Sequence, residues 1–425
     1  MTLNKLTFNY FLILFALIPI TFLIGSAVSV LNILLIDLSF IILIGLRRDF
    51  TFLKSKPIIY LFALYIYLIF NSFISLDFSE GLPRNFGFIR MIILFAAFNY
   101  FLVDETFLKK MLKFWFTVIF IVLVDVFIEN FTGQNILGHS GHLGFEGETN
   151  SRVVSFFKDE QIVGSYLNGF YLILCGFLLN KYFNQNKKID LIIVSSIALL
   201  ILVAIVFTGE RSSSIKAFLA LGFFVLFIKQ INLSRKIILV LIVNILILYT
   251  IMSSSFLKMR FINQITYAIT LSNLSEKNEP GSRLGSKDTV YYELYRSGLY
   301  VFKNNKIFGV GNKNYRVEAC KEGIRYYYCS THPHQIYFEL LSEHGIVGTL
   351  IFIFILFKLV FSKIIQTLKS TNYLKMGSFI YIGLIFIPLL PSGAFFNNFS
   401  LTIFMINLSI FCAVDRNSNI FLQKN

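Results

Sequence analysis

The chain has 425 residues, of which 56% are hydrophobic, 17% aromatic and only 14% charged. A water-soluble protein of this length needs far more charged surface, so soluble nucleotide-binding, nucleic-acid-binding and disordered proteins are excluded. The mean hydropathy of +0.72 predicts an all-α polytopic membrane protein. The net charge of +15 is therefore attributed to the Lys/Arg excess of cytoplasmic loops, and no nucleic-acid partner is expected.

Twelve apolar segments are long enough to cross a bilayer, which takes about 20 residues in a helix. In chain order they lie at about 8–25, 28–46, 57–74, 88–103, 112–128, 163–180, 190–207, 215–231, 237–256, 345–362, 376–392 and 398–414. The first two form one apolar run whose length argues against a cleaved signal peptide. Three regions follow: nine spans in residues 1–256, a long loop in 257–344, and three spans with a tail in 345–425.

The distribution of basic residues predicts the orientation of these helices. With the amino terminus inside, the inward loops and tails hold nineteen Lys and Arg residues, against four in the short outward loops. Cytoplasmic loops carry the basic excess in membrane proteins. Both termini are therefore expected in the cytoplasm, and the loop 257–344 is expected on the outer face.

All five histidines fall on the predicted outer face, at His139, His142, His332, His334 and His344. The chain has no Asp-x-Asp pair and no Walker-type loop, so an enzyme here is expected to work outside without ATP or a sugar nucleotide. His139 and His142 are interpreted as solvated loop residues. His334 precedes a helical apolar stripe and is expected at the membrane surface, where a simple interfacial histidine is the alternative.

Two cysteines and four arginines of the outer loops have predicted roles. Cys320 and Cys329 lie nine positions apart, and we expect a disulfide that fixes the segment before His334, with two free thiols as the alternative. Guanidinium groups bind phosphate bidentately and keep their charge at any pH. The candidates for phosphate binding are Arg152, Arg211, Arg283 and Arg296. For Arg211, a salt bridge with Glu210 or another carboxylate is the alternative.

Several motifs resemble those of one family. The stretch CSTHPHQIYFELLSEHGIVG resembles the His-Asn-x-x-Leu and Glu-x-Gly-x-x-Gly motifs of the O-antigen ligase and O-antigen polymerase superfamily of bacterial envelope enzymes. SRVVSFFKDEQIVGSYL, TGERSSSIKAF and YELYRSGLYVFKNNKIFGVGNKNY are similar to its arginine segment, its Thr-Gly-x-Arg turn and the segment ahead of the loop's end. Gln335 replaces the common Asn, and Tyr295 replaces a usual Trp, so the second loop arginine is either Arg283 or Arg296.

The resemblance implies a metal-independent glycosyltransferase without cofactors in the bacterial inner membrane, with its active site on the periplasmic face. It implies an undecaprenyl-diphosphate-linked glycan as donor, a glycan or lipid A-core as acceptor, and membrane lipids as surroundings. His334 would be the general base or would position the acceptor, and the arginines would bind the diphosphate. The residues expected to orient these groups are Glu160, Gln335 and Glu343.

Two other functions remain open at this stage. In a transporter of a small anion such as bicarbonate, the same arginines would attract the anion, and ionisable groups are expected in the middle of spans. Asp37 and Asp125 are the main candidates for such groups, although Asp125 lies towards the outer end of its span. A structural envelope protein would leave the outward arginines and histidines unexplained. The motifs do not separate a ligase from a polymerase.

Overall fold

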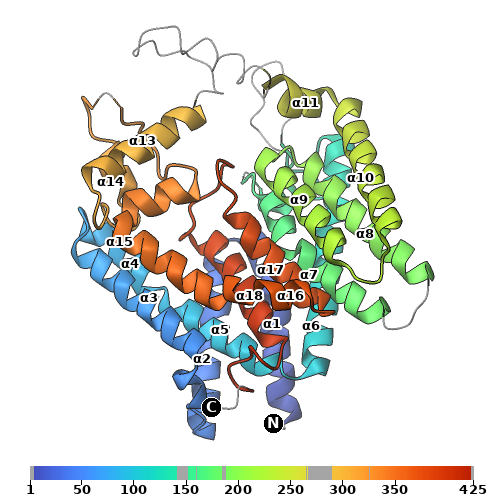
Figure 1. Ribbon diagram of the computed structural model, residues 1–425, viewed down its shortest axis with the longest axis horizontal. Coiled ribbons are helices and arrows are strands. Elements are labelled where there is room, and N and C mark those ends of the chain that lie inside the picture. Colours follow the sequence, from blue (N-terminus) through green and yellow to red (C-terminus); the bar gives the residue numbers. More distant parts are fainter. Residues whose placement is uncertain are drawn as a thin grey trace.

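The computed structural model describes residues 4–140, 152–158, 160–183, 188–264, 266, 290–324 and 326–422. These residues are helical throughout and form no strand (Figure 1). Each of the twelve predicted segments contains a helix. The long helices are α1 (Lys5–Ile24), α2 (Ser26–Arg47), α3 (Lys56–Phe73), α5 (Ile89–Phe101), α6 (Glu105–Thr132), α7 (Val163–Phe183), α8 (Lys188–Phe207), α9 (Arg211–Phe227), α10 (Leu233–Ser253), α15 (Ile336–Leu359), α17 (Tyr373–Ile385) and α18 (Asn398–Ala413).

The remaining helices lie beside these or in the loops. They are α4 (Phe78–Phe86), α11 (Ser255–Lys258), α13 (Val290–Asn304), α14 (Tyr315–Ala319) and α16 (Ile364–Leu368). Among the described residues, eight helical segments are long and apolar enough to cross a membrane, with α4 and α5 joined as one. This confirms a polytopic all-α membrane protein, whereas the count of twelve spans stays a prediction.

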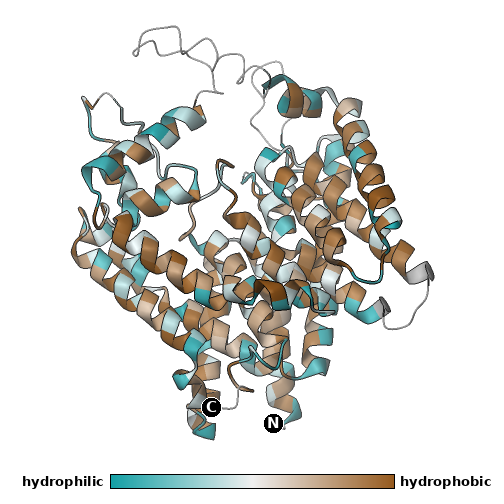
Figure 2. Ribbon diagram, in the orientation of Figure 1, coloured by the Kyte–Doolittle hydropathy of each residue, from teal (hydrophilic) through white to brown (hydrophobic). Residues whose placement is uncertain are grey.

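Both termini lie at one end of the helical bundle, and α13 and α14 lie at the other (Figure 1). Apolar residues dominate the long helices, and polar residues concentrate in α13, α14 and the connections at the two ends (Figure 2). This distribution is expected of a bundle whose middle is surrounded by lipid and whose ends meet water. The two termini share one side, as the distribution of basic residues predicts.

Helix α7 lies in the centre of the bundle, and small residues let α17 approach it closely. A Cβ atom on Gly176 of α7 would lie 2.4 Å from the Tyr373 carbonyl oxygen, and one on Gly377 of α17 would lie 2.4 Å from that of Leu172. Membrane helices commonly pack through such residues because lipid gives them little hydrophobic drive to associate. These two contacts fix α17, and with it the loop that leads from α17 to α18.

Helix α15 is broken at Gly345, where the backbone has φ 62° and ψ −166°. The break leaves the Glu343 carbonyl to accept the Gly311 amide at 2.9 Å, and it leaves the Val347 amide to donate to the Ile307 carbonyl at 3.1 Å. Glycine is required at the break because a Cβ there would lie 2.4 Å from the Ile307 oxygen. The end of the long loop is thereby built into α15.

Candidate functional site

The segment that carries Arg152 is held by two carboxylates of α6. Glu129 accepts the backbone amides of Val154 at 3.0 Å and Ser155 at 2.6 Å, and Asp125 accepts the Ser155 hydroxyl. Ser155 has a positive φ of 47°, a strained conformation that persists only where the surroundings fix it. Asp125 is thus bonded to the segment between α6 and α7.

Both carboxylate oxygens of Glu210, the residue before Arg211, accept hydrogen bonds. It accepts the amides of Gly164 at 2.6 Å and Ser165 at 3.1 Å, and the hydroxyl of Ser213 at 2.8 Å. Burial raises the pKa of Glu210, while these donors and Arg152 act in the opposite direction. No ion pair joins Arg211 to a carboxylate among the described residues. The structure therefore does not contain the alternative salt bridge.

Three arginines surround the turn between α8 and α9. Arg211 is the first residue of α9, and Arg152 lies against Gly209 and interacts electrostatically with Glu210 and Arg211. Arg260 donates to the Gly209 carbonyl at 3.3 Å. Burial lowers the pKa of Arg152, but a guanidinium stays protonated at any physiological pH. The turn is thus a region of fixed positive charge. The sequence did not predict that Arg260 belongs to it, because no motif includes this residue.

His334 is positioned by its own backbone and by the cap of α15. It has a positive φ of 54°, and its carbonyl accepts the Ser392 amide at 2.8 Å. The Gln335 side chain caps α15 by accepting the amides of Tyr337 at 2.8 Å and Phe338 at 3.1 Å. Gln335, the residue at the predicted amide position, therefore fixes the start of α15 directly after His334.

Two aromatic neighbours line the His334 ring. The ring centroid lies 3.9 Å from that of His332 and 6.2 Å from that of Tyr291. Tyr291 also interacts electrostatically with Arg152. Burial lowers the pKa of His334 below its ordinary value, and burial with the neighbouring His334 lowers the pKa of His332 to about 4. Both imidazoles are therefore neutral at neutral pH and able to accept a proton.

One loop, residues 386–397 between α17 and α18, connects the arginines to His334. Ser212, which follows Arg211, donates its hydroxyl to the Pro391 carbonyl, and the next loop residue, Ser392, bonds the His334 carbonyl. The loop is fixed at its other end by Glu339 of α15, whose oxygens accept the Phe395 amide at 2.9 and 3.0 Å. In Figure 1 this loop rises between α13 and α9.

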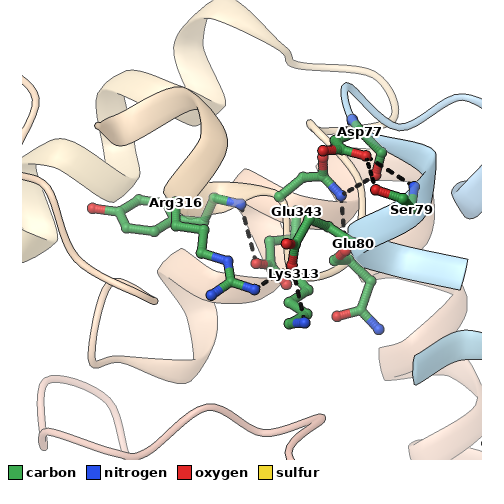
Figure 3. Close-up of polar contacts among 9 residues, drawn as sticks. Asp77, Ser79, Glu80, Lys313, Arg316 and Glu343 are labelled. Atoms are coloured by element: carbon green, nitrogen blue, oxygen red, sulfur yellow. Dashed lines mark hydrogen bonds and ion pairs between the residues drawn. The ribbon is translucent and has the colours of Figure 1, made fainter. Parts of the chain in front are cut away.

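Glu343 supports the base of the long loop. Its Oε1 atom accepts the Tyr315 amide at 3.3 Å. Nearby, Glu80 of α4 forms ion pairs with Lys313 at 2.9 Å and with Arg316 (Figure 3). These contacts join α4, α14 and α15 into one support, so Glu343 acts on the position of the loop.

The remaining candidates do not meet at this site. Arg296 lies over the Tyr326 ring, 4.1 Å from its centroid, on a different face of α13 from Tyr295, whose ring packs on Phe338. Glu160 is exposed. Arg283 and His142 lie outside the described residues, whereas His139 is described and exposed.

Cys320 and Cys329 are joined by a disulfide just ahead of the histidines. The bonded cysteines close a short ring at the side of α14. Within the described part of the chain, no three His, Cys, Asp or Glu side chains gather in a way that could hold a metal ion.

Comparison with known families agrees with the motifs. Residues 196–353 match the family described as O-antigen ligase, and no curated protein matches the chain. The matched range includes Arg211, Arg296, His334 and Glu343, whereas Arg152 precedes it. The match confirms the resemblance and supports the assignment of this membrane protein to the O-antigen ligase and polymerase superfamily.

Proposed function

We propose that the protein transfers a glycan from an undecaprenyl-diphosphate-linked donor to a glycan or lipid A-core acceptor on the periplasmic face of the inner membrane. One observation carries the proposal: a single loop bonds both Ser212, beside Arg211, and His334. These contacts support a single site that combines fixed cations with a neutral imidazole. These are the groups that a transfer from a diphosphate to a hydroxyl requires.

In this reaction an acceptor hydroxyl attacks the anomeric carbon of the donor sugar. The new glycosidic bond forms as the bond from that carbon to the diphosphate oxygen breaks, and undecaprenyl diphosphate leaves. Arg152 and Arg211 stabilise the negative charge that develops on the leaving group, without a divalent metal. Arg283 is the remaining candidate for the second loop arginine, because Arg296 stacks on Tyr326.

His334 takes the proton from the acceptor hydroxyl. A general base must be neutral to do so, and burial keeps the pKa of His334 below its ordinary value. Gln335 and Glu343 support the reaction indirectly, since one caps α15 and the other holds the loop base. Glu160 has no supporting contact, so it is left without a role in this proposal.

The transporter alternative is disfavoured by the contacts of Asp125. This carboxylate accepts the Ile136 amide at 2.8 Å and the Ser155 hydroxyl, so it holds the outer loop and is not available to a translocating ion. Asp37 of α2 then remains, with no hydrogen-bond partner for its oxygens among the described residues. Of the two groups named from the sequence, Asp37 alone is weaker support for a translocation path than the contacts around Arg211 and His334 are for glycan transfer.

The experiment that tests the proposal is lipopolysaccharide banding in a deletion strain of the source organism. Loss of all O-chain would indicate a ligase, and core with a single repeat unit would indicate a polymerase. Complementation with the wild-type gene should restore the bands, and complementation with His334→Ala should not. Unchanged banding in the deletion strain would contradict the proposed function, and uptake of labelled bicarbonate would then be measured.

A further inference from the structure

Two buried polar atoms beside His334 have no partner. By hydrogen-bond geometry among the described residues, neither the Nε2 atom of His332 nor the hydroxyl of Ser392 has a partner, and the Ser392 backbone lies close enough to the His332 ring to raise its pKa against the effect of burial. Both residues are otherwise fixed, since His332 Nδ1 lies 2.9 Å from the Thr331 hydroxyl and the Ser392 amide donates to the His334 carbonyl. Buried polar atoms without a partner are rare in folded proteins and call for an explanation such as a missing ligand.

A guanidinium group faces the same place. Arg84 of α4 is half-buried and interacts electrostatically with His332, Glu339 and Glu343. Its guanidinium forms no ion pair with a described carboxylate. Arg84, His332 and Ser392 therefore present hydrogen-bonding groups around His332, whose ring lies against that of His334.

The charge balance of this place indicates its ligand. Arg84 interacts electrostatically with three carboxylates, those of Glu80, Glu339 and Glu343, and with one further guanidinium, that of Arg316. The oxygens of Glu339 and Glu343 accept backbone amides. There is thus no excess of positive charge to attract an anion. Around the α8–α9 turn, by contrast, the three guanidinium groups of Arg152, Arg211 and Arg260 surround one carboxylate, that of Glu210.

We propose that Arg84, His332 and Ser392 form the acceptor-sugar subsite, where they bind neutral sugar hydroxyls next to the hydroxyl that reacts. A guanidinium donates, whereas a serine hydroxyl and a neutral imidazole each donate or accept, which matches the mixed character of sugar hydroxyls. The inference rests on the proposed function, and it adds that the site is divided into a donor part and an acceptor part. The diphosphate lies at the arginine turn, the acceptor lies towards α4, and His334 stands between them.

The test is steady-state transfer by the purified full-length protein in proteoliposomes. The probes are the lipid-linked glycan and the acceptor fraction, both purified from the deletion strain, in which they accumulate unused. Ser392→Ala removes only the hydroxyl and keeps the amide that holds His334. It should raise the KM for the acceptor fraction by about fivefold, the effect of one ordinary hydrogen bond, and leave the maximal rate nearly unchanged. Arg84→Ala should raise the same KM by more.

Thermal unfolding separates this role from a structural one. Because the Ser392 hydroxyl has no partner in the described structure, its removal should not lower the unfolding temperature. Ser362→Ala is the matched control, since that hydroxyl donates to the Lys358 carbonyl at 3.0 Å at the other end of α15, and its KM should equal that of the wild type. A lower unfolding temperature together with a reduced maximal rate in Ser392→Ala would show a structural role and overturn the inference.

Inorganic pyrophosphate separates the inference from the proposed function. It should compete with the donor equally in the wild type and in Ser392→Ala, and less well in Arg211→Ala. Unchanged acceptor KM in both Ser392→Ala and Arg84→Ala, with transfer lost in Arg211→Ala, would overturn the acceptor subsite and leave the proposed function intact. Absence of transfer by the wild type would overturn the proposed function and this inference with it.

Discussion

The two sides of the candidate site are built differently but follow one rule. The arginine side consists of Arg152, Glu210 and Arg211, and the histidine side consists of His332, His334, Glu339 and Glu343. On both sides the carboxylates accept backbone amides, and among the described residues none of them forms an ion pair with an arginine. A carboxylate that accepts amides fixes a loop while leaving cations and imidazoles available. The buried acids therefore shape the site, and the other groups act on the substrate.

The guanidinium groups of one side and the imidazoles of the other respond differently to pH. The arginine side carries guanidinium groups whose charge does not change with pH, and its segments are anchored on α6 and α7 inside the bundle. The histidine side carries imidazoles that are neutral at neutral pH, and it is anchored on the broken helix α15 and on α13. Substitutions and pH should consequently affect the two sides in separable ways.

The largest expected effect is on the histidine side. His334→Ala should reduce transfer by about 100 to 10,000-fold, the usual contribution of a general base. His139→Ala is the matched control, because His139 is exposed and remote from the site motifs, and it should keep normal activity. His332→Ala should keep much of the activity, with the loss confined to the acceptor KM. Banding of the polymer on a gel measures all three.

His334→Gln separates two roles of the same residue. A glutamine keeps a polar side chain but cannot take a proton from the acceptor. Substantial transfer by this variant would show that His334 positions the acceptor and that its basicity is not needed. Normal polymer from His334→Ala at native expression would contradict both roles.

The next effect is on the arginine side. Arg152→Ala or Arg211→Ala should reduce transfer by about 100 to 1,000-fold, as expected when one preorganised group that stabilises developing charge is lost. Lys replacements should restore only part of the rate, because an ammonium lacks the bidentate fork. Activity should survive EDTA. Full activity in both Ala variants, or a strict need for a divalent metal, would contradict the role of these arginines.

The pH dependence of proton transfer should come from His334. His334 has a lowered pKa because of burial, so its neutral, proton-accepting form persists at pH values below about 6.5, the usual imidazole pKa. Transfer should fall about tenfold per pH unit only once the pH drops below this lowered pKa. The pH profile of Arg211→Lys should have the same midpoint as the wild type. A midpoint above the ordinary histidine value would contradict the neutral-base assignment.

A smaller effect is expected from the carboxylate that shapes the arginine side. Glu129→Gln keeps an acceptor oxygen but replaces one of the two oxygens that bind the Val154 and Ser155 amides. Losing one such bond should lower transfer roughly tenfold by loosening the segment of Arg152. Replacement of Glu105 by Lys serves as the control, because Glu105 is an exposed residue at the other end of α6. An unchanged rate in Glu129→Gln would show that Arg152 is held by other contacts.

The sequence was informative about the helices and about residues that lie in motifs. Apolar runs mark the helices because lipid demands them, and the segments around Arg211 and His334 match a known pattern. The roles of Glu129, Glu210 and Glu339 were not predictable, since each accepts amides from residues brought near only by the fold. Arg84 lies in the connection between two predicted spans, 57–74 and 88–103, and the sequence marked it only as a basic residue of an outward loop.

The motif residues themselves also showed the limits of spacing. Arg283 and Arg296 were equal candidates from the sequence, and the ring contact of Arg296 with Tyr326 could not be foreseen because Tyr326 comes from a segment thirty positions later. The Gly309-Val310-Gly311 segment reads as a turn, whereas it is bonded into the break of α15 at Gly345. That pairing depends on the break in α15, which no local sequence pattern predicts.

The smallest expected effect concerns the disulfide beside the histidine side. Peptide mapping under non-reducing conditions should recover Cys320 and Cys329 as one linked pair, and Cys329→Ser should lower stability by about 2 to 4 kcal/mol in the loop-entropy account of short rings. Transfer should fall only severalfold, because the ring segment is also held by the Tyr327 hydroxyl, which donates to Glu318 at 2.8 Å, and by the Tyr328 amide, which donates to Ser297 at 3.1 Å. The chemistry of His334 itself is untouched. Recovery of both cysteines as free thiols would contradict the bond, and a loss of transfer as large as that of His334→Ala would mean that the ring does more than hold the loop.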